Sequence, residues 1–385
     1  MSGSGAPLPL SGLLVADFGR VLAAPYATML LADLGADVIK VEHPAGGDDT
    51  RAWGPPHAHG EATYFLSVNR NKRSVALDLR DAADRRRAVE LARRADVLFE
   101  NFRPGTLRKY GLGYEEVCAG NPGVVYCSIT GFGSGPGAAL PGYDLLIQAV
   151  GGLMSVTGSA PGEPVKAGVA LVDVLTGLHA AVGVLAALRH RDATGEGQLI
   201  EVDLLTTLLS SLVNQSAGYT LAGRVPGIMG NRHPSIAPYE VYRAKDQPLV
   251  IAVGNDRQFA ALCAGVGAPD LAVDARFLTN ADRVAQVDEL ARELGGLLAA
   301  RTAAEWFEHL TPLGVPCGPV NDIGQAFALA DRLGLAPRAT LDGADGPALD
   351  LVANPISLSR TPPRYDRRPP RLGEHTGEIA DWLDS

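Results

Sequence analysis

The chain has 385 residues, of which 46% are hydrophobic and 20% are charged, and its formal net charge is −9. These values are typical of a globular protein with room for two domains, and the acidic balance argues against a general nucleic-acid or membrane-surface role. Four widely spaced cysteines without a CxxC pair predict neither a disulfide framework nor a zinc site. Because no signal-peptide pattern and no apolar run of ~18 residues is evident, we expect a cytoplasmic protein without a membrane partner.

The first 130 residues alternate between two hydrophobic periods. Short apolar runs predict buried strands, and apolar residues at helical spacing predict helices between them. Gly35 closes the first helical run, as a C-terminal cap residue does. The predicted strands are 13–16, 37–41, 74–79, 97–99 and 124–129, and the predicted helices are 24–34 and 82–95. This alternation predicts an α/β fold with a Rossmann-like parallel sheet, whose ligands bind in the loops after the strands.

The second half of the chain predicts two further helices, a linker and a smaller domain. Helices are expected at 178–188 and 204–213 around a strand at 199–202, and a Gly- and Pro-rich stretch at 223–233 is typical of a linker or loop. A strand at 249–253 and helices at 257–266, 284–300 and 303–310 predict an α+β domain, the last helix opening on a Thr302–Glu305 capping box. We therefore predict a large domain at 1–215, a small domain at 225–330 and a C-terminal return at 331–385 that completes the large domain.

Asp173 stands in an apolar stretch, 169–177, that leads into the predicted helix 178–188. Removing a carboxylate from water is costly, so a sequence that places one among apolar residues predicts a partner or a chemical role for it. The plain interpretation is a helix N-cap, because aspartate ahead of an apolar helical run satisfies free backbone amides. A catalytic carboxylate is the other interpretation.

Two groups of loop residues predict anion binding. Arg70, Lys72 and Arg73 place three cations within four residues, an arrangement that suits phosphate groups but also occurs in solvated charge runs. Segment 100–105 follows a predicted strand and is expected to open a helix near Gly105, where backbone amides and the helix dipole favour an anion. The loop after the first strand, 17–25, lacks G-x-G-x-x-G, so a nicotinamide or flavin dinucleotide enzyme is not indicated.

These segments, together with several others in the same order, resemble the family III CoA-transferases. That family includes formyl-CoA, carnitine and dicarboxylate CoA-transferases and the related α-methylacyl-CoA racemases. The resemblance runs from Leu10 to Thr376, so it covers nearly the whole chain. The segments that carry it are 34–42, 69–74, 100–105, 142–144, 172–173, 195–198, 254–256 and 314–319.

The resemblance implies that Asp173 is the nucleophile of a CoA-transferase. A carboxylate attacks an acyl-CoA thioester to give a mixed anhydride and CoA thiolate, which then forms an aspartyl-CoA thioester. The acceptor acid collects CoA by the reverse steps, so one hard exchange is divided into several easier ones. The implied partners are an acyl-CoA and a free carboxylic acid, with coenzyme A as a substrate and with no permanently bound cofactor and no metal.

The resemblance also implies a set of binding residues. The CoA-binding set, together with the nearby cations, is Leu22, Ala23, His43, Arg70, Lys72, Arg73, Leu77, Asp78, Leu79, Arg80, Asn101, Phe102, Arg103, Lys109 and Tyr143. A loop over the substrate is implied at Gly230, Asn231, Arg232 and His233. Family members often have Gln in place of Leu22 and Arg in place of His43, so the contacts to the adenosine phosphates differ here and Arg70 or Arg80 would compensate.

A racemase and a non-catalytic acyl-CoA-binding protein are the alternatives, and a thioesterase would result if water reached the site. The racemases have His in the 142–144 motif and Glu near position 254, whereas this chain has Tyr143 and Asn255. Tyrosine, with a pKa of about 10, is a poor base at neutral pH, and asparagine does not titrate, so two-base proton exchange is disfavoured. A binding protein would leave Asp173 no role beyond capping.

The acceptor acid is constrained mainly by segment 231–239, which resembles family members that act on dicarboxylates such as succinate, glutarate, citramalate or mesaconate. Arg232 and His233 would hold the distal carboxylate. The implied loop lacks the consecutive glycines of the formyl-CoA enzymes, which argues against formyl and oxalate substrates. Family members form interlocked dimers, so the resemblance also implies a homodimer.

Overall fold

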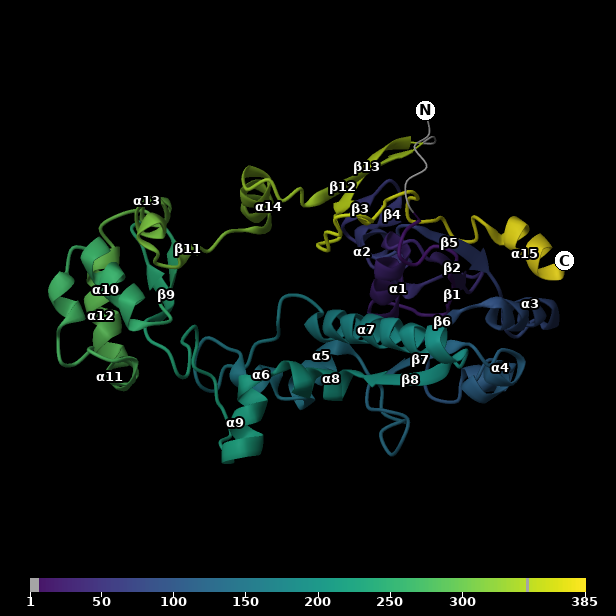
Figure 1. Cartoon of the computed structure of the whole chain (residues 1–385), viewed down its shortest axis with the longest axis horizontal. Coiled ribbons are helices and arrows are strands. Elements are labelled where there is room, and N and C mark those ends of the chain that lie inside the picture. Colours follow the sequence, from purple (N-terminus) through teal and green to yellow (C-terminus); the bar gives the residue numbers. More distant parts are fainter. Residues whose placement is uncertain (1–6, 344–345) are drawn as a thin grey trace. The chain divides into compact units, whose positions relative to one another are not determined.

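A computed structural model of the chain describes residues 7–343 and 346–385 (Figure 1). The chain forms two compact units. The described residues of the first fall within Met1–Leu153, Ala167–Arg224 and Leu335–Ser385, and the second comprises Met154–Lys166 and Val225–Gly334. Segment 154–166, which the sequence placed in the large domain, therefore belongs to the smaller unit.

The first unit is built on a six-stranded parallel sheet with the order β5-β2-β1-β6-β7-β8. Its strands are β1 (Leu14–Asp17), β2 (Asp37–Glu42), β5 (Lys72–Ala76), β6 (Val97–Glu100), β7 (Val125–Thr130) and β8 (Gln198–Asp203). On one half of the sheet the chain adds β1, β2 and β5 in turn toward one edge, and on the other half it adds β6, β7 and β8 toward the opposite edge. The order in which strands are added therefore reverses between β1 and β6. The α/β prediction is confirmed, and its topology is that of the Rossmann sheet.

Helices cover both faces of this sheet (Figure 1). Successive residues of each strand point to opposite faces, so each strand contributes apolar side chains to two cores. Val15 and Val97 face a core shared with α1 (Ala23–Asp33), α7 (Leu171–Thr194) and α8 (Leu204–Ser211). Ala16 and Leu98, one residue further along each strand, face a core shared with α3 (Ala82–Arg94), α4 (Tyr114–Gly120) and α15 (Thr376–Asp384). Burial on both faces is the reason that these strands read as continuous apolar runs.

Helix α7 begins seven residues before the helix predicted at 178–188 and ends six residues after it. Among the residues that the structure describes, α7 is the one helix long and apolar enough to cross a membrane by length and composition alone. Its apolarity has a packing explanation in the fold, because Ala180, Val184 and Leu188 lie in the core against α1 and the sheet.

The C-terminal segment returns to the first unit. The backbone N–H of His375 donates to the carbonyl of Ser74 (2.9 Å), and the Ser74 N–H donates to Nδ1 of His375 (3.2 Å). An antiparallel pair precedes this segment, formed by β12 (Arg338–Gly343) and β13 (Gly346–Val352).

The second unit carries its own core, which encloses Phe259, Leu294 and Trp306. Its antiparallel sheet has the order β11-β10-β9, with β9 (Tyr239–Arg243), β10 (Pro248–Ala252) and β11 (Cys317–Pro319). The predicted capping box at Thr302 and Glu305 is present at the start of α13. The helices of this unit include α10 (Asp256–Gly265), α11 (Asn280–Ala285), α12 (Val287–Leu298), α13 (Ala303–Leu310) and α14 (Ile323–Arg332).

Short elements complete the chain. The remaining helices are α2 (Thr63–Ser67), α5 (Asp144–Val150), α6 (Leu153–Val156) and α9 (Asn214–Ala222), with 3-10 turns that include Asp49–Ala52 and Leu107–Tyr110. A two-stranded pair, β3 (His57–Ala58) and β4 (Glu61–Ala62), precedes α2. Of these elements, α2 and α5 matter most for the site, because they supply Tyr64 and Asp144.

Candidate active site

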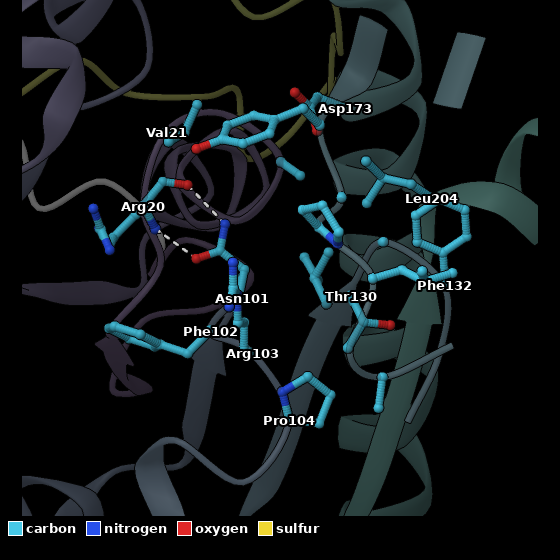
Figure 2. Close-up of a pocket in the computed structure, with 18 of the residues that line it drawn as sticks. Arg20, Val21, Asn101, Phe102, Arg103, Pro104, Thr130, Phe132, Asp173 and Leu204 are labelled. Carbon is cyan, nitrogen blue, oxygen red and sulfur yellow. Dashed lines mark hydrogen bonds between the residues drawn. The ribbon is translucent and has the colours of Figure 1, made fainter. Parts of the chain in front are cut away.

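Two cavities of the first unit are lined by loops at the carboxyl ends of its parallel strands. One, of about 390 Å³, is lined by residues that follow β1, β6 and β7 and by Asp173 (Figure 2); we call it the Asp173 cavity. The other, of about 420 Å³, is lined by residues that follow β1, β2 and β5 and includes Arg80; we call it the Arg80 cavity. Both therefore include the loop after β1, where the winding reverses and where ligands bind in sheets of this kind.

Asp173 lies in the first turn of α7 and is half-buried. Its carboxyl does not cap the helix: the N-cap position is Ala170, which has no side-chain capping bond. Burial, followed by the charge of the nearby Asp144 carboxylate, raises the pKa of Asp173 to about 7. The helix-cap interpretation of Asp173 is therefore wrong, and a carboxylate with a strongly raised pKa faces the cavity (Figure 2).

The cap of α7 comes instead from Asp144, the first residue of α5. One Asp144 oxygen, Oδ1, accepts hydrogen bonds from the backbone N–H groups of Val172 (2.8 Å) and Asp173 (3.2 Å). The other, Oδ2, accepts from Nε2 of Gln148 (2.5 Å), whose Oε1 in turn accepts from the N–H of Ala167 (2.8 Å). Asp144 thus fixes the turn that carries Asp173 and places a second negative charge beside it.

Tyr64, on α2, lines neither cavity but lies close enough to Asp173 to feel its charge, and sequence reasoning did not single it out. Burial raises the pKa of the Tyr64 hydroxyl to about 12, with the charge of Asp173 as the next cause and that of Asp144 after it. Its ring meets that of Trp53 edge to face, with centroids 5.4 Å apart. A neutral phenol of this kind stays protonated at neutral pH and remains a hydrogen-bond donor close to the carboxylate.

The loop after β1 is held in a strained conformation at the edge of the site. Val21, a β-branched residue, has φ of 66°, which side chains of its type rarely adopt. Asn101 binds the backbone of Arg20, the residue before Val21. The Asn101 Oδ1 accepts from the Arg20 N–H (2.8 Å) and its Nδ2 donates to the Arg20 carbonyl (2.7 Å) (Figure 2). From the other side, both Asp48 carboxylate oxygens accept from the Val21 N–H, at 3.3 and 3.2 Å. The backbone of this loop is therefore held by side-chain hydrogen bonds on two sides.

A buried charge network supports the loop, with one hydrogen bond to its Gly19 carbonyl. Lys40 pairs with Asp48 (2.9 Å) and donates to the carbonyl of Gly19 (2.8 Å), while Lys72 pairs with Asp17 (3.1 Å). Burial alone would raise the pKa of Asp48, but the Lys40 ammonium and the hydrogen bonds from Thr50 together lower it to about 2. Removing one member would leave an unpaired buried charge, which costs about 3–5 kcal/mol.

The cation cluster that the sequence singled out belongs to this framework and not to the cavities. Arg70 is 2% exposed and pairs with Asp33 through two hydrogen bonds, of 2.9 and 2.7 Å. Lys72 is fully buried, and Arg73 pairs with Asp37 and Glu378. These three side chains line neither cavity, so the structure does not bring them to a ligand there.

The remaining predicted residues divide between the two cavities. Leu22, Ala23, Asn101, Phe102, Arg103 and Tyr143 line the Asp173 cavity, and His43, Leu77, Asp78, Leu79 and Arg80 line the Arg80 cavity, which also includes Phe102. Lys109 is exposed in the turn Leu107–Tyr110 and lines neither. In the Arg80 cavity, Arg80 donates to Asp78 (2.9 Å) and lies 3.1 Å from Nε2 of His43.

The predicted substrate loop lies in the second unit. Arg232 pairs there with Glu240 (3.0 Å) and with Asp288 (2.5 Å), and the His233 N–H donates to the Tyr239 carbonyl (3.1 Å). The role of residues 230–233 toward the acid remains a prediction.

Residues 10–376 match the model of CoA-transferase family III. The chain belongs to this family. It is 44% identical to the succinate–glutarate CoA-transferase of Agrobacterium fabrum, over 98% of this chain and 96% of that one. It is also 41% identical to the succinyl-CoA:glutarate CoA-transferase of Mus musculus, over 96% of this chain and 85% of the relative.

A solved structure supports the same assignment for the fold. The crystal structure of a CaiB/BaiF family protein from Brucella suis matches with a TM-score of 0.88 and 41% identity, covering 98% of this chain and 100% of that one. The predictions of a family III CoA-transferase and of an α/β architecture are both confirmed. The assignment also gives the two cavities a chemical setting, since enzymes of this family act on CoA thioesters.

Proposed function

We propose that this CoA-transferase moves CoA from an acyl-CoA thioester to a free carboxylic acid, with Asp173 as the covalent nucleophile. The observation that carries the proposal is a half-buried carboxylate with a raised pKa, facing a cavity that shares residues with a second, cation-bearing cavity. A nucleophile needs this combination, because partial desolvation makes a carboxylate more reactive while the cavity admits the thioester.

The proposed steps balance without ATP, a metal or a resident cofactor. The Asp173 carboxylate attacks the thioester carbonyl, the carbon–sulfur bond breaks, and a mixed anhydride and CoA thiolate form. The thiolate then attacks the aspartyl carbonyl and releases the donor acid, leaving an aspartyl-CoA thioester. The acceptor carboxylate attacks this thioester to form a second anhydride, from which the thiolate takes the acyl group and regenerates Asp173.

The two cavities suit the two ends of CoA. Arg80 and His43 offer cationic and hydrogen-bonding groups for phosphates in the Arg80 cavity, and the Asp173 cavity would take the pantetheine and the thioester. Phe102 lines both, so an extended ligand passing its ring would reach from one cavity to the other. In this placement the carbonyl of the thioester comes to the Asp173 end.

Proton exchange at the α-carbon, the racemase reaction, is not favoured at this site. Tyr143, at the position of the racemase histidine, lines the Asp173 cavity, and a tyrosine hydroxyl is a much weaker base than a histidine imidazole. Asn255, at the position of the racemase glutamate, caps α10 through its side chain and has no titratable group. At these two positions the chain therefore has neither of the bases that the racemases use for such exchange.

Dicarboxylates are the acceptor class we propose. Relatives that align over nearly the whole chain carry the names of transferases for succinate and glutarate, and others act by name on mesaconate or oxalate. To test this, succinyl-CoA is incubated with a panel of mono- and dicarboxylic acids, and the exchange of CoA is read by mass spectrometry. We expect C4–C6 dicarboxylates to accept CoA at least about tenfold faster than monocarboxylates, because a site that binds the second carboxylate of the acceptor loses that interaction with a monocarboxylate. Equal rates across the panel would contradict the proposed class.

We further propose that the enzyme is a homodimer. Helix α7 exposes Leu178, Val182 and Leu185, at 40%, 67% and 39%, although their neighbours on the same helix are buried in the core. Apolar side chains gathered on one helix face mark a surface that a partner covers. Sedimentation equilibrium at micromolar concentration should give twice the chain mass of 40.2 kDa, and a single species at the monomer mass would contradict the dimer.

The proposed place of action is the cytoplasm. The four cysteines are free thiols and none of them pairs with another, which fits a reducing compartment. The acyl-CoA donor and the acid acceptor are small molecules, so the reaction calls for neither a nucleic acid nor a membrane partner.

A further inference from the structure

An exposed ion pair stands where the two cavities meet. Four residues line both cavities, namely Arg20, Asp49, Phe102 and Thr106. Two of them carry charge, and Arg20 donates a hydrogen bond to the Asp49 carboxylate, with 44% and 48% of the two side chains exposed. An extended ligand that occupies both cavities must therefore pass this pair.

The surroundings of Arg20 leave its side chain able to change partner while its backbone stays in place. Asn101 holds the Arg20 N–H and carbonyl, and the strained Val21 follows directly. The guanidinium carbon lies 5.8 Å from the centre of the Phe102 ring, and it points away from Thr130 and Leu204 across the Asp173 cavity (Figure 2). Arg70 differs in this respect, because it is buried and bound to Asp33 on two atoms.

We propose that Arg20 and Asp49 form a charge latch, in which Asp49 holds Arg20 until the diphosphate of CoA takes the place of the carboxylate. This inference rests on the proposed CoA-transferase function and adds a phosphate ligand and its internal competitor to that site. A guanidinium binds phosphate and carboxylate oxygens through the same hydrogen-bonding geometry, and an exposed ion pair is weak. A diphosphate with two negative charges, already held near Arg80, displaces a single exposed carboxylate.

The latch also has a use in an enzyme whose second substrate is an anion. An unpaired Arg20 would bind a free carboxylate at the position meant for the CoA diphosphate. The Asp49 carboxylate neutralises Arg20 and repels small anions while the site is empty, so discrimination comes from a repulsive element as well as an attractive one. Free carboxylic acids are thereby kept from competing with CoA.

The test measures the Kd of free CoA by calorimetry for the wild type, Asp49→Asn, Arg20→Met and the double variant. Asp49→Asn should tighten CoA binding by about three- to tenfold, because the carboxylate that competes for the Arg20 guanidinium is removed. Arg20→Met should weaken it by about tenfold, since a charge-assisted contact is lost. In the Arg20→Met background, Asp49→Asn should give less than about a twofold gain, because there is no longer a guanidinium to release.

Two further measurements sharpen the result. Free succinate should compete with CoA in Asp49→Asn at concentrations that leave the wild type unaffected. Glu116→Gln is the matched control, since it removes one negative charge from an exposed carboxylate paired with Arg108 (3.2 Å) and lines neither cavity. Its Kd for CoA should equal that of the wild type.

Each outcome decides the question. If the wild type binds CoA but Asp49→Asn binds no more tightly, the latch is overturned and the proposed function stands. If Asp49→Asn tightens binding equally with and without Arg20, Asp49 acts as a simple negative charge and the latch is again overturned. If the wild type does not bind CoA at all, the proposed function falls and the latch falls with it.

Discussion

Replacing Asp173 with asparagine is expected to lower kcat for CoA transfer by about 10⁴-fold or more, as the loss of a covalent nucleophile does. Asparagine has nearly the same shape as aspartate but cannot form the anhydride. The Kd for CoA should change by less than about threefold, because the Arg80 cavity does not include residue 173. Exchange of CoA between an acyl-CoA and a free acid measures the first quantity, and calorimetry measures the second.

A matched control lies on the same helix. Asp192 is exposed in the last turns of α7, so Asp192→Asn makes the same chemical change away from the cavities and should leave kcat unaltered. Asp173→Ala serves as a second variant in which the side chain is removed entirely. Retention of more than a few per cent of wild-type turnover by both Asp173 variants would show that another group carries the acyl transfer.

Replacing Asp144 with alanine is expected to lower kcat by about 10²-fold, the typical effect of displacing a catalytic group by about 1 Å. Its carboxylate accepts hydrogen bonds from the amides of Val172 and Asp173, so alanine frees the first turn of α7. The loss of a helix cap also costs about 0.5–2 kcal/mol of stability. Asp81→Ala is the control for that cost, because Asp81 caps α3 through two amides and lines neither cavity.

The pH profile separates the charge of Asp144 from its capping role. Asp173 must be ionised to attack, and burial together with Asp144 raises its pKa to about 7, so kcat of the wild type should fall as pH drops through 7. Asp144→Asn keeps an acceptor for the amides but removes the negative charge, so the pKa of Asp173 falls and the acidic limb moves to lower pH. Asp81→Ala should leave the pH at which kcat falls unchanged. If Asp144→Asn also leaves this pH unchanged, Asp144 acts through structure alone.

The strands and the buried helices followed from local patterns in the sequence. The predicted strands 37–41 and 97–99 are β2 and β6, and the predicted helix 303–310 is α13 to the residue. The start of α7 did not follow, because its cap is the side chain of Asp144, which lies 27 residues before the helix begins. Local capping rules recognise a cap only when it stands next to its helix.

A candidate site residue can be picked from the sequence when its own chemical type suggests its role. It cannot be picked when its role depends on which distant residues it contacts in the fold. A carboxylate among apolar residues drew attention to Asp173, and the family resemblance implied its role, which stays a prediction. The cluster at Arg70 and Lys72, in contrast, gave no sign that Asp33 and Asp17 would pair with both cations. Those partners come from α1 and β1, more than 35 residues away in the chain. Arg20 was missed for the opposite reason, because nothing in its sequence neighbourhood indicates that the sheet reverses its winding beside it.

Covalent capture of the enzyme during turnover tests the proposed nucleophile most directly. The enzyme is incubated with acyl-CoA and hydroxylamine, digested, and its peptides are sequenced by mass spectrometry. We expect a hydroxamate on Asp173, because hydroxylamine attacks the aspartyl carbonyl of the enzyme-CoA thioester, and we expect no label without acyl-CoA. An unmodified Asp173 peptide from enzyme that is still exchanging CoA, or a hydroxamate on a different residue, would contradict the mechanism.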